Sequence, residues 1–241
     1  MKTEIIQSRK PGLWKKIGWA VMLLLAALTV LITSRYLTLD PDVYFPEQKV
    51  VYMAHITFLM VHIVASMLAI IIGPFQFLPG IRKGRWLKLH RLLGRTYVLG
   101  ILFGGLSGLY MAQLAHGGPI ACLGFTLLAV LWLFSGFRAY KHIRNKEIER
   151  HREWMTRNYA LTFAAVMLRV WNPIFGMMGI DFTTGYIVVA WLAWMPNLAL
   201  VEFAIRRNRS RQQNSMINAM SAPIRKRETA ELEQTLGVGE G

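Results

Sequence analysis

The 241-residue chain is 54% apolar, has a positive mean hydropathy and carries a formal net charge of +15. This charge does not indicate nucleic-acid binding, because 25 of the 28 Lys and Arg residues lie in four segments that alternate with long apolar runs: residues 2–16, 82–95, 138–157 and 206–227. Cytoplasmic loops collect Lys and Arg, so the pattern predicts a multi-pass membrane protein with both termini in the cytoplasm. The single Cys122 excludes an internal disulfide and a clustered thiolate zinc site.

Six segments are long and apolar enough to cross a bilayer, so we predict an all-α, polytopic transmembrane helix bundle. In chain order the spans are Ile17–Thr33, Val51–Gly73, Leu92–Leu114, Pro119–Phe137, Asn158–Met178 and Thr184–Ile205. The first has no small-residue cleavage site after it, which favours a retained anchor over a signal peptide. No connection on the outer side is long enough to form a domain.

The predicted organisation is therefore one transmembrane domain, residues 17–205, between two cytoplasmic segments. A basic N-terminus, residues 1–16, precedes it, and a tail, residues 206–241, follows it as a disordered segment or a loose surface helix. We expect the protein in the cell (plasma) membrane. Its basic inner face should attract anionic lipid headgroups.

Small residues line one face of the third span. Gly100, Gly104 and Gly108 follow one another at intervals of four, which brings them onto one stripe of a helix. Such a stripe lets a second backbone or a flat ligand approach closely. It predicts helix packing within the bundle, a homodimer contact or the wall of a ligand site.

Two ionisable side chains lie at similar depth near the middle of the bilayer. Arg169 stands 11 residues after Asn158, about 16 Å into the fifth span. His62 lies at the middle of the second span, and no Asp or Glu shares this depth. Arg169 therefore bonds to backbone carbonyls and polar neighbours such as Asn172, faces a water-filled cavity, or neutralises an anionic ligand.

His55 and His62 lie seven residues apart, nearly two helical turns, so one face of the second span should carry both. Small residues continue on that face, which would admit a porphyrin ring. The alternative is that both histidines are hydrogen-bonded packing residues. His116 and His142 are expected in exposed loops, and the sequence does not assign them a role.

A doubled motif precedes the third and fifth spans. His90 to Tyr97 and His151 to Tyr159 each read His-Arg, then three or four residues, then Arg-x-Tyr. Two imidazoles at one depth would form a bis-His metal site for haem b, with His90 and His151 as the iron ligands. Gly94 would give the ring room and Tyr97 would flank the pocket. The propionates would pair with nearby arginines: Arg91, Arg95, Arg152 and Arg157. The alternative is that the histidines bind headgroups or loop carbonyls.

The strings Gly73-Pro74-Phe75-Gln76-Phe77, His90-Arg91-x2-Gly94-Arg95-x-Tyr97 and His151-Arg152-x-Trp154-Met155-x-Arg157-x-Tyr159 carry a resemblance. Over about residues 50–205 the chain resembles a bacterial integral-membrane family classed as a domain of unknown function. That family is distantly similar to the two-haem transmembrane cytochrome b proteins, in which paired His on helices hold haems. This chain offers one inner His pair, so the resemblance implies a single haem rather than two.

The leading hypothesis is a haem-binding electron-transfer protein, in which His62 and Arg169 form a second site for a quinone, another haem or a propionate. It would work with a redox partner. The alternative is a cofactor-free membrane protein, such as a small transporter or an assembly partner, that uses His62 and Arg169 as a polar path. The chain lacks HExxH and GxSxG, which disfavours an intramembrane hydrolase, but it does not decide whether the protein is an enzyme.

Overall fold

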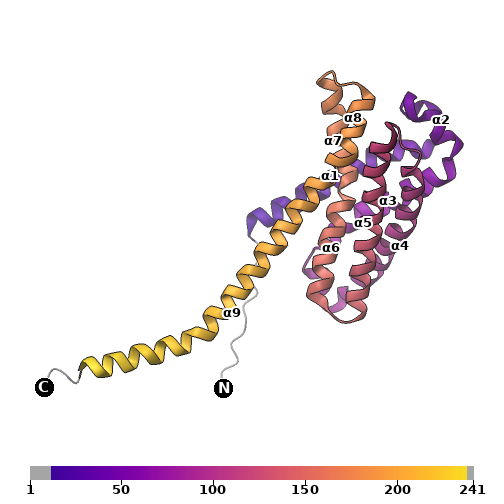
Figure 1. Cartoon of the computed structure of the whole chain (residues 1–241). Helices are drawn as coiled ribbons and strands as arrows, with labels where there is room; N and C mark the ends of the chain where they lie inside the picture. The colour runs from indigo at the N-terminus through magenta and orange to yellow at the C-terminus, as the bar shows by residue number, and fades with distance from the viewer. Residues whose placement is uncertain (1–11, 238–241) are drawn as a thin grey trace. The chain divides into compact units, whose positions relative to one another are not determined.

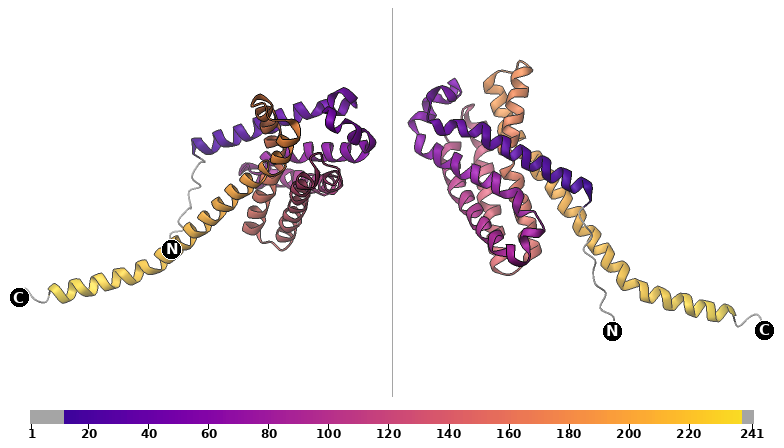
Figure 2. Two further views of the ribbon diagram at one scale, coloured as in Figure 1. Left: turned by 45° about the horizontal axis from the view of Figure 1, so that its top comes forward. Right: turned by 180° about the vertical axis from the view of Figure 1, so that it is seen from behind.

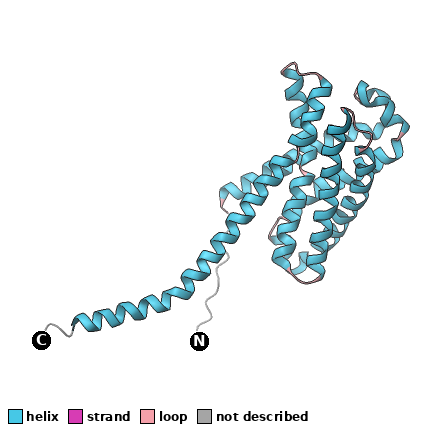
Figure 3. Ribbon diagram, in the orientation of Figure 1, coloured by secondary structure: helices cyan, strands magenta, loops and turns pink. Residues whose placement is uncertain are grey.

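The structure is a computed structural model that describes residues 12–237, and every regular element within this range is a helix (Figure 3). The longer helices are α1 (Leu13–Ser34), α2 (Pro46–Ala54), α3 (Ile56–Gln76), α4 (Leu87–Ala112), α5 (Gly118–Arg144), α6 (Ile148–Thr162), α7 (Ala164–Met177), α8 (Phe182–Leu192) and α9 (Met195–Gly237). Short 3-10 turns cover Arg35–Thr38, Pro41–Val43, Gly80–Arg82 and Gly84–Trp86. Six helical stretches are long and apolar enough to cross a membrane, which confirms the predicted all-α class and number of spans.

Helices α3, α4, α5 and α6 lie side by side as an up-and-down bundle (Figure 1). The glycine stripe of α4 explains how closely α3 approaches. A Cβ on Gly100 would lie 2.9 Å from the backbone oxygen of Ala65, and one on Gly108 would lie 2.7 Å from Nδ1 of His62. These distances are too short for any side chain, so the stripe serves packing between α3 and α4.

Helix α1 crosses the outside of this bundle (Figure 2), where it packs against α3 and α7. Trp19 of α1 donates its indole N–H to the backbone oxygen of Pro74 at 2.8 Å. Helices α7 and α8 form a hairpin, and α8 also packs against α5. The segments 82–95 and 138–157 meet at one end of the bundle, which we call the basic end.

The chain divides into a unit that ends at Leu198 and a second unit from Ala199 onward. Within the second unit, the described residues continue α9 as far as Gly237, and the Glu202 carboxylate bonds to Arg206 one turn later. Of the tail expected at 206–241, the described residues are helical as far as Gly237. Residues 1–11 and 238–241 lie outside the described part of the chain.

Three predicted spans are interrupted, which the apolar runs did not reveal. A break at His55 separates α2 from α3, Phe163 separates α6 from α7, and Ala193 with Trp194 separates α8 from α9. The amide of Asn197 donates to the backbone oxygens of Ala160, at 3.4 Å, and Ala193, at 2.9 Å, beside the last two breaks. Backbone groups released by a break inside a membrane need such partners.

The segment between α1 and α3 folds into short helices that we call the cap, residues 35–54. The rings of Tyr36, Tyr44 and Tyr52 contact one another in sequence, with centroids 5.4 and 5.8 Å apart, and the second pair meets edge to face. Phe45 meets Phe182 of α8 at 5.1 Å. The connection is too short for a domain, as expected, but its aromatic residues close one end of the bundle opposite the basic end.

A buried polar cluster joins α4, α5 and α6. Asn158 has no exposed surface, donates to the backbone oxygen of Trp132 and the hydroxyl of Ser135, and accepts from Tyr97 at 2.8 Å. Thr162 bonds to the Tyr97 hydroxyl at 3.0 Å and accepts from the Trp132 indole. Both protons of the Asn158 amide and its oxygen are satisfied, so the cluster fixes the register of three helices.

A second tyrosine repairs the backbone of α3. Pro74 has no N–H, so it cannot complete the helical hydrogen bond to the backbone oxygen of Ile70, four residues earlier. The Tyr159 hydroxyl of α6 donates to that oxygen at 3.1 Å, and both residues are buried. Its ring fits against Gly73, where a Cβ would collide with the ring carbons. Tyr159 therefore replaces the missing donor and ties α6 to α3.

We predict that Tyr159→Phe lowers the melting temperature by several degrees, because a buried carbonyl loses its donor at a cost of about 1–3 kcal/mol. In a Pro74→Ala background the same change should cost less, since alanine at this position supplies the backbone N–H. Thermal unfolding of the four proteins in detergent measures this coupling. Tyr140→Phe, at an exposed ring, is the control. Equal losses in both backgrounds would contradict the repair.

Candidate functional site

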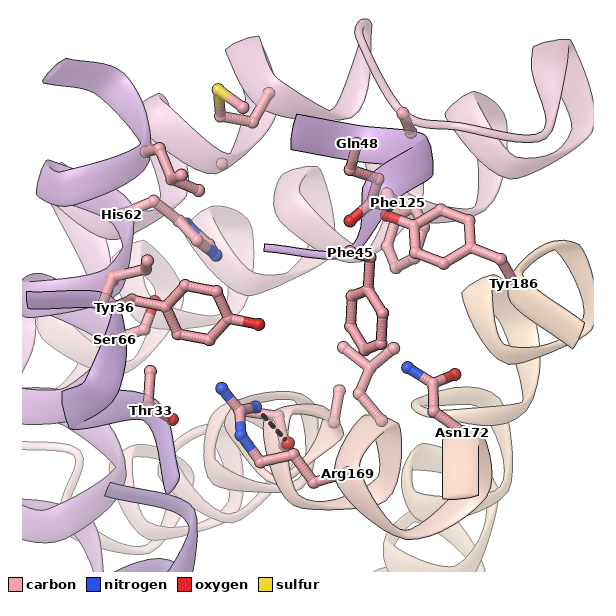
Figure 4. A pocket seen from close by; sticks show the side chains of 18 of the residues that line it. Thr33, Tyr36, Phe45, Gln48, His62, Ser66, Phe125, Arg169, Asn172 and Tyr186 are labelled. Carbon is pink, nitrogen blue, oxygen red and sulfur yellow. Dashed lines mark hydrogen bonds between the residues drawn. The ribbon is translucent and has the colours of Figure 1, made fainter. Parts of the chain in front are cut away.

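A cavity of about 840 Å³ lies beneath the cap, in the half of the bundle away from the basic end. Its walls come from α1, the cap, α3, α4, α5, α6, α7 and α8. Figure 4 shows that the side chains of Tyr36, His62 and Arg169 point into one space. The volume is within the range of small-molecule pockets, about 300–1,000 Å³. Both predicted mid-membrane residues thus line one cavity.

The orientation of His62 is set by the backbone of α4. Its Nδ1 lies 2.8 Å from the backbone oxygen of Gly104. A carbonyl oxygen can only accept, so Nδ1 carries the proton, and in the neutral ring Nε2 is an acceptor. The absence of a side chain at Gly108 leaves room for the imidazole. His62 therefore presents a fixed acceptor nitrogen, and the ring lines the cavity.

Arg169 is half-buried and folds back on its own helix. One guanidinium nitrogen donates to the backbone oxygen of Ala165 at 2.7 Å. Among the described residues no carboxylate forms an ion pair with it. Its charge nevertheless acts on His62, so the two groups lie within electrostatic range of each other. Of the three alternatives for Arg169, the structure combines a carbonyl bond with exposure to a cavity.

The carboxylates that line the cavity are at its exposed rim and have other partners. Asp42 bonds to Lys49 of the cap at 2.7 Å, and this bond and the lysine charge lower the pKa of Asp42. Asp181 accepts from the backbone N–H of Thr184 at the start of α8. Hydrogen bonds from Thr184 lower the pKa of Asp181. Both therefore stay ionised at neutral pH without neutralising Arg169.

Polar groups of the cap and α8 complete the cavity, and sequence reasoning did not single them out. Gln48 lies in α2 and Tyr186 in α8, and both line the cavity with Tyr52. Gln48 is 4% exposed and its side chain interacts with the Tyr186 hydroxyl, whereas the buried Tyr44 hydroxyl has no hydrogen-bond partner among the described residues. Gln48 lies in a short connection and Tyr186 lies near a loop, so no hydrophobic periodicity pointed to either residue. An unpartnered buried donor beside a cavity is a feature of a binding site.

His55 does not share the site of His62. It lies at the break before α3, where its Nδ1 is 3.0 Å from the Tyr110 hydroxyl. His116 follows α4 and bonds to Thr183 at 2.8 Å. Neither lines the cavity. Both histidines face α4, as expected of one helical face, but only His62 lines the cavity.

At the basic end, α4 and α6 bring His90 and His151 within electrostatic range of each other. The imidazole of His151 bonds through Nδ1 to the backbone oxygen of Ala139 at 2.9 Å, which leaves its Nε2 uncommitted. Nδ1 of His90 is buried and has no partner. Burial, and to a smaller extent the charge of Arg152, lower the pKa of Arg82. The Arg82 charge also acts on His90.

The other residues expected around a haem have different surroundings. A Cβ on Gly94 would be 3.5 Å from the Gln76 side chain, so Gln76 occupies the space expected for a ring. Tyr97 belongs to the Asn158 cluster. Arg152 bonds to both oxygens of Glu149, and Arg157 lies over Trp154 and 3.9 Å from Glu153. Arg91 and Arg95 are exposed.

His142 was expected in an exposed loop, and this prediction was wrong. It is 6% exposed near the end of α5, and its Nδ1 lies 3.0 Å from the Glu147 carboxylate. The span predicted to end at Phe137 continues as helix to Arg144, which turns His142 toward the bundle. Across the described residues, no group of three or more His, Cys, Asp or Glu is arranged to hold a metal ion.

Residues 59–205 match the model of a family of predicted membrane proteins, DUF2306, over more than half of the chain. The chain belongs to this family. The match runs from α3 to the first part of α9, so it covers the basic end and the cavity walls from α3 to α8, but not those from α1 and the cap. It confirms the expected family of unknown function. No curated protein and no solved structure matches the chain.

We predict that Arg169→Leu raises the melting temperature of the ligand-free protein by a few degrees. A half-buried charge without a carboxylate partner costs more than it contributes, and leucine fills similar space. Thermal unfolding in detergent measures the change. Arg157→Leu is the comparison and should lower the melting temperature, because it removes contacts with Glu153 and Trp154. A large loss in Arg169→Leu would mean that the arginine holds the fold together.

Proposed function

We propose that the protein is a membrane-embedded binding protein, whose cavity receives a lipid-soluble molecule with an oxyanion head group. The observation that carries this proposal is the Arg169 guanidinium, which lines an 840 Å³ cavity and has no carboxylate partner among the described residues. A charge at this depth is costly. A ligand that brings the opposite charge offsets the cost each time it binds.

The chemistry of the lining supports both parts of this ligand. The guanidinium has donors in a planar fork that matches a carboxylate or a phosphate. Hydroxyls at Tyr36 and Ser66 lie around the same space (Figure 4) and can donate further hydrogen bonds, whereas the Thr33 hydroxyl donates to the backbone oxygen of Thr29. Apolar side chains form most of the remaining wall, among them Ile63, Met67, Leu128, Leu168 and Phe175. An acyl or isoprenoid chain would be buried against them.

Decanoate tests the proposal, with decanol as the uncharged probe of equal chain length. We expect decanoate to raise the melting temperature by several degrees at about 100 times its dissociation constant, which corresponds to about 2.7 kcal/mol. Decanol should have little effect. Arg169→Leu should lose the response, whereas Arg144→Leu, at an exposed residue near the end of α5, should keep it. Equal stabilisation by both probes, or a response that survives in Arg169→Leu, would rule out the oxyanion site.

A second candidate is haem b binding at the basic end. Two neighbouring imidazoles with uncommitted nitrogens, His90 and His151, support it. Imidazole is a common ligand of haem iron. The porphyrin does not fit beside Gly94 while Gln76 fills that space. Haem binding would therefore require Gln76 to move, and the paired arginines would have to exchange Glu149 and Glu153 for propionates.

The visible spectrum of the purified protein tests this candidate, before and after dithionite and after expression with haem supply. Bis-His haem would give a Soret band that sharpens on reduction and resolved α and β bands. His90→Ala and His151→Ala should abolish them, whereas His142→Ala should not. Gln76→Ala should increase haem content. A protein that stays colourless after added haemin would exclude haem at this pair.

A further inference from the structure

The proposed oxyanion meets a conflict at His62. The Nδ1 proton is committed to the backbone oxygen of Gly104, so the neutral ring faces the cavity with the lone pair of Nε2. An ionised head group that binds Arg169 also offers only lone pairs to this nitrogen. Two acceptors that face each other repel and cannot form a hydrogen bond. A proton between them converts the repulsion into a charge-assisted bond.

We propose that the cavity binds its acidic ligand together with one proton, which lies between His62 Nε2 and the head group while Arg169 binds the other oxygen. This inference rests on the proposed function and specifies the chemical form of its ligand. The complex is a carboxylic acid beside neutral imidazole or a carboxylate beside imidazolium. Both forms have the same atoms and the same net charge, so the proton balance does not depend on its exact position.

The surroundings explain why the proton arrives with the ligand. Without an anion, imidazolium at His62 would place a second positive charge beside Arg169 in a poorly solvated space, which is unfavourable. With an anion present, one negative charge lies between two donors. The carboxylate and the proton therefore favour each other's binding, and by linkage the effect is reciprocal.

Among the described residues, His62 is the only imidazole in the cavity wall, and imidazole is the side chain whose ordinary pKa lies between 6 and 8. The remaining ionisable lining residues are Arg35, Tyr36, Asp42, Tyr44 and Tyr52 from the cap, Arg169 from α7, and Asp181 and Tyr186 at the start of α8. Arginine and tyrosine keep their protons in this range, and both aspartates have lowered pKa values. The lining residues of α4 and α5 contain no titratable side chain. His62 is thus the acceptor for the proton.

Calorimetry of decanoate binding to the full chain in phosphatidylcholine nanodiscs tests the inference, with empty nanodiscs as background. Decanoate in solution is ionised above about pH 6. The dissociation constant of the wild-type complex should therefore rise tenfold per pH unit, about 100-fold from pH 6 to 8. Titrations at pH 7 in buffers of different ionisation enthalpy should report the uptake of one proton.

In His62→Gln the uptake should fall to zero and the affinity should become independent of pH, because an amide can donate to the carboxylate directly. His116→Gln, which changes a histidine outside the cavity, should retain the wild-type slope. Wild-type binding with a flat pH profile and no proton uptake would overturn proton-linked binding and leave the oxyanion site intact. Failure of decanoate to bind the wild type at any pH would overturn both proposals.

Discussion

The fold depends on one backbone oxygen that proline leaves without a partner. Pro74 cannot donate to the carbonyl of Ile70, and in a bilayer no water would do so, which makes an external donor obligatory. The hydroxyl of Tyr159 meets this need from α6. For the ring to arrive there, Gly73 must lack a side chain. This contact joins the second span to the fifth and so closes the bundle whose other end holds the cavity.

The tyrosines of the doubled motif have a structural role that attention to its histidines missed. Its two tyrosines occupy matched positions, and both bond to buried groups of other helices. Tyr97 bonds to Asn158, and Tyr159 bonds to Ile70. The proline string that precedes the third span contributes Gly73 and Pro74 to the same arrangement. The residues that carried the family resemblance therefore act first on the packing of the bundle, whatever the histidines bind.

The sequence was enough to predict the six spans, because the bilayer alone determines where Lys and Arg collect and how long the apolar runs must be. It also marked His62 and Arg169, since ionisable groups at mid-membrane are rare. It failed where tertiary contacts decide. Of the two histidines that face α4 only His62 reaches the cavity, and the cap supplied Gln48 from a connection without periodicity. The space expected at Gly94 was lost to Gln76, which no pattern in α4 could reveal.

The position of Arg169 has a consequence for biogenesis. Its span, Ile148–Met177, is the least apolar of the six, and a central arginine adds about 2.5–3.5 kcal/mol to the cost of transfer through the translocon. The stretch also carries Pro173. We expect this segment to leave the translocon together with α5, to which a short turn joins it, rather than alone. Arg169 thereby bears on the order in which the spans enter the membrane.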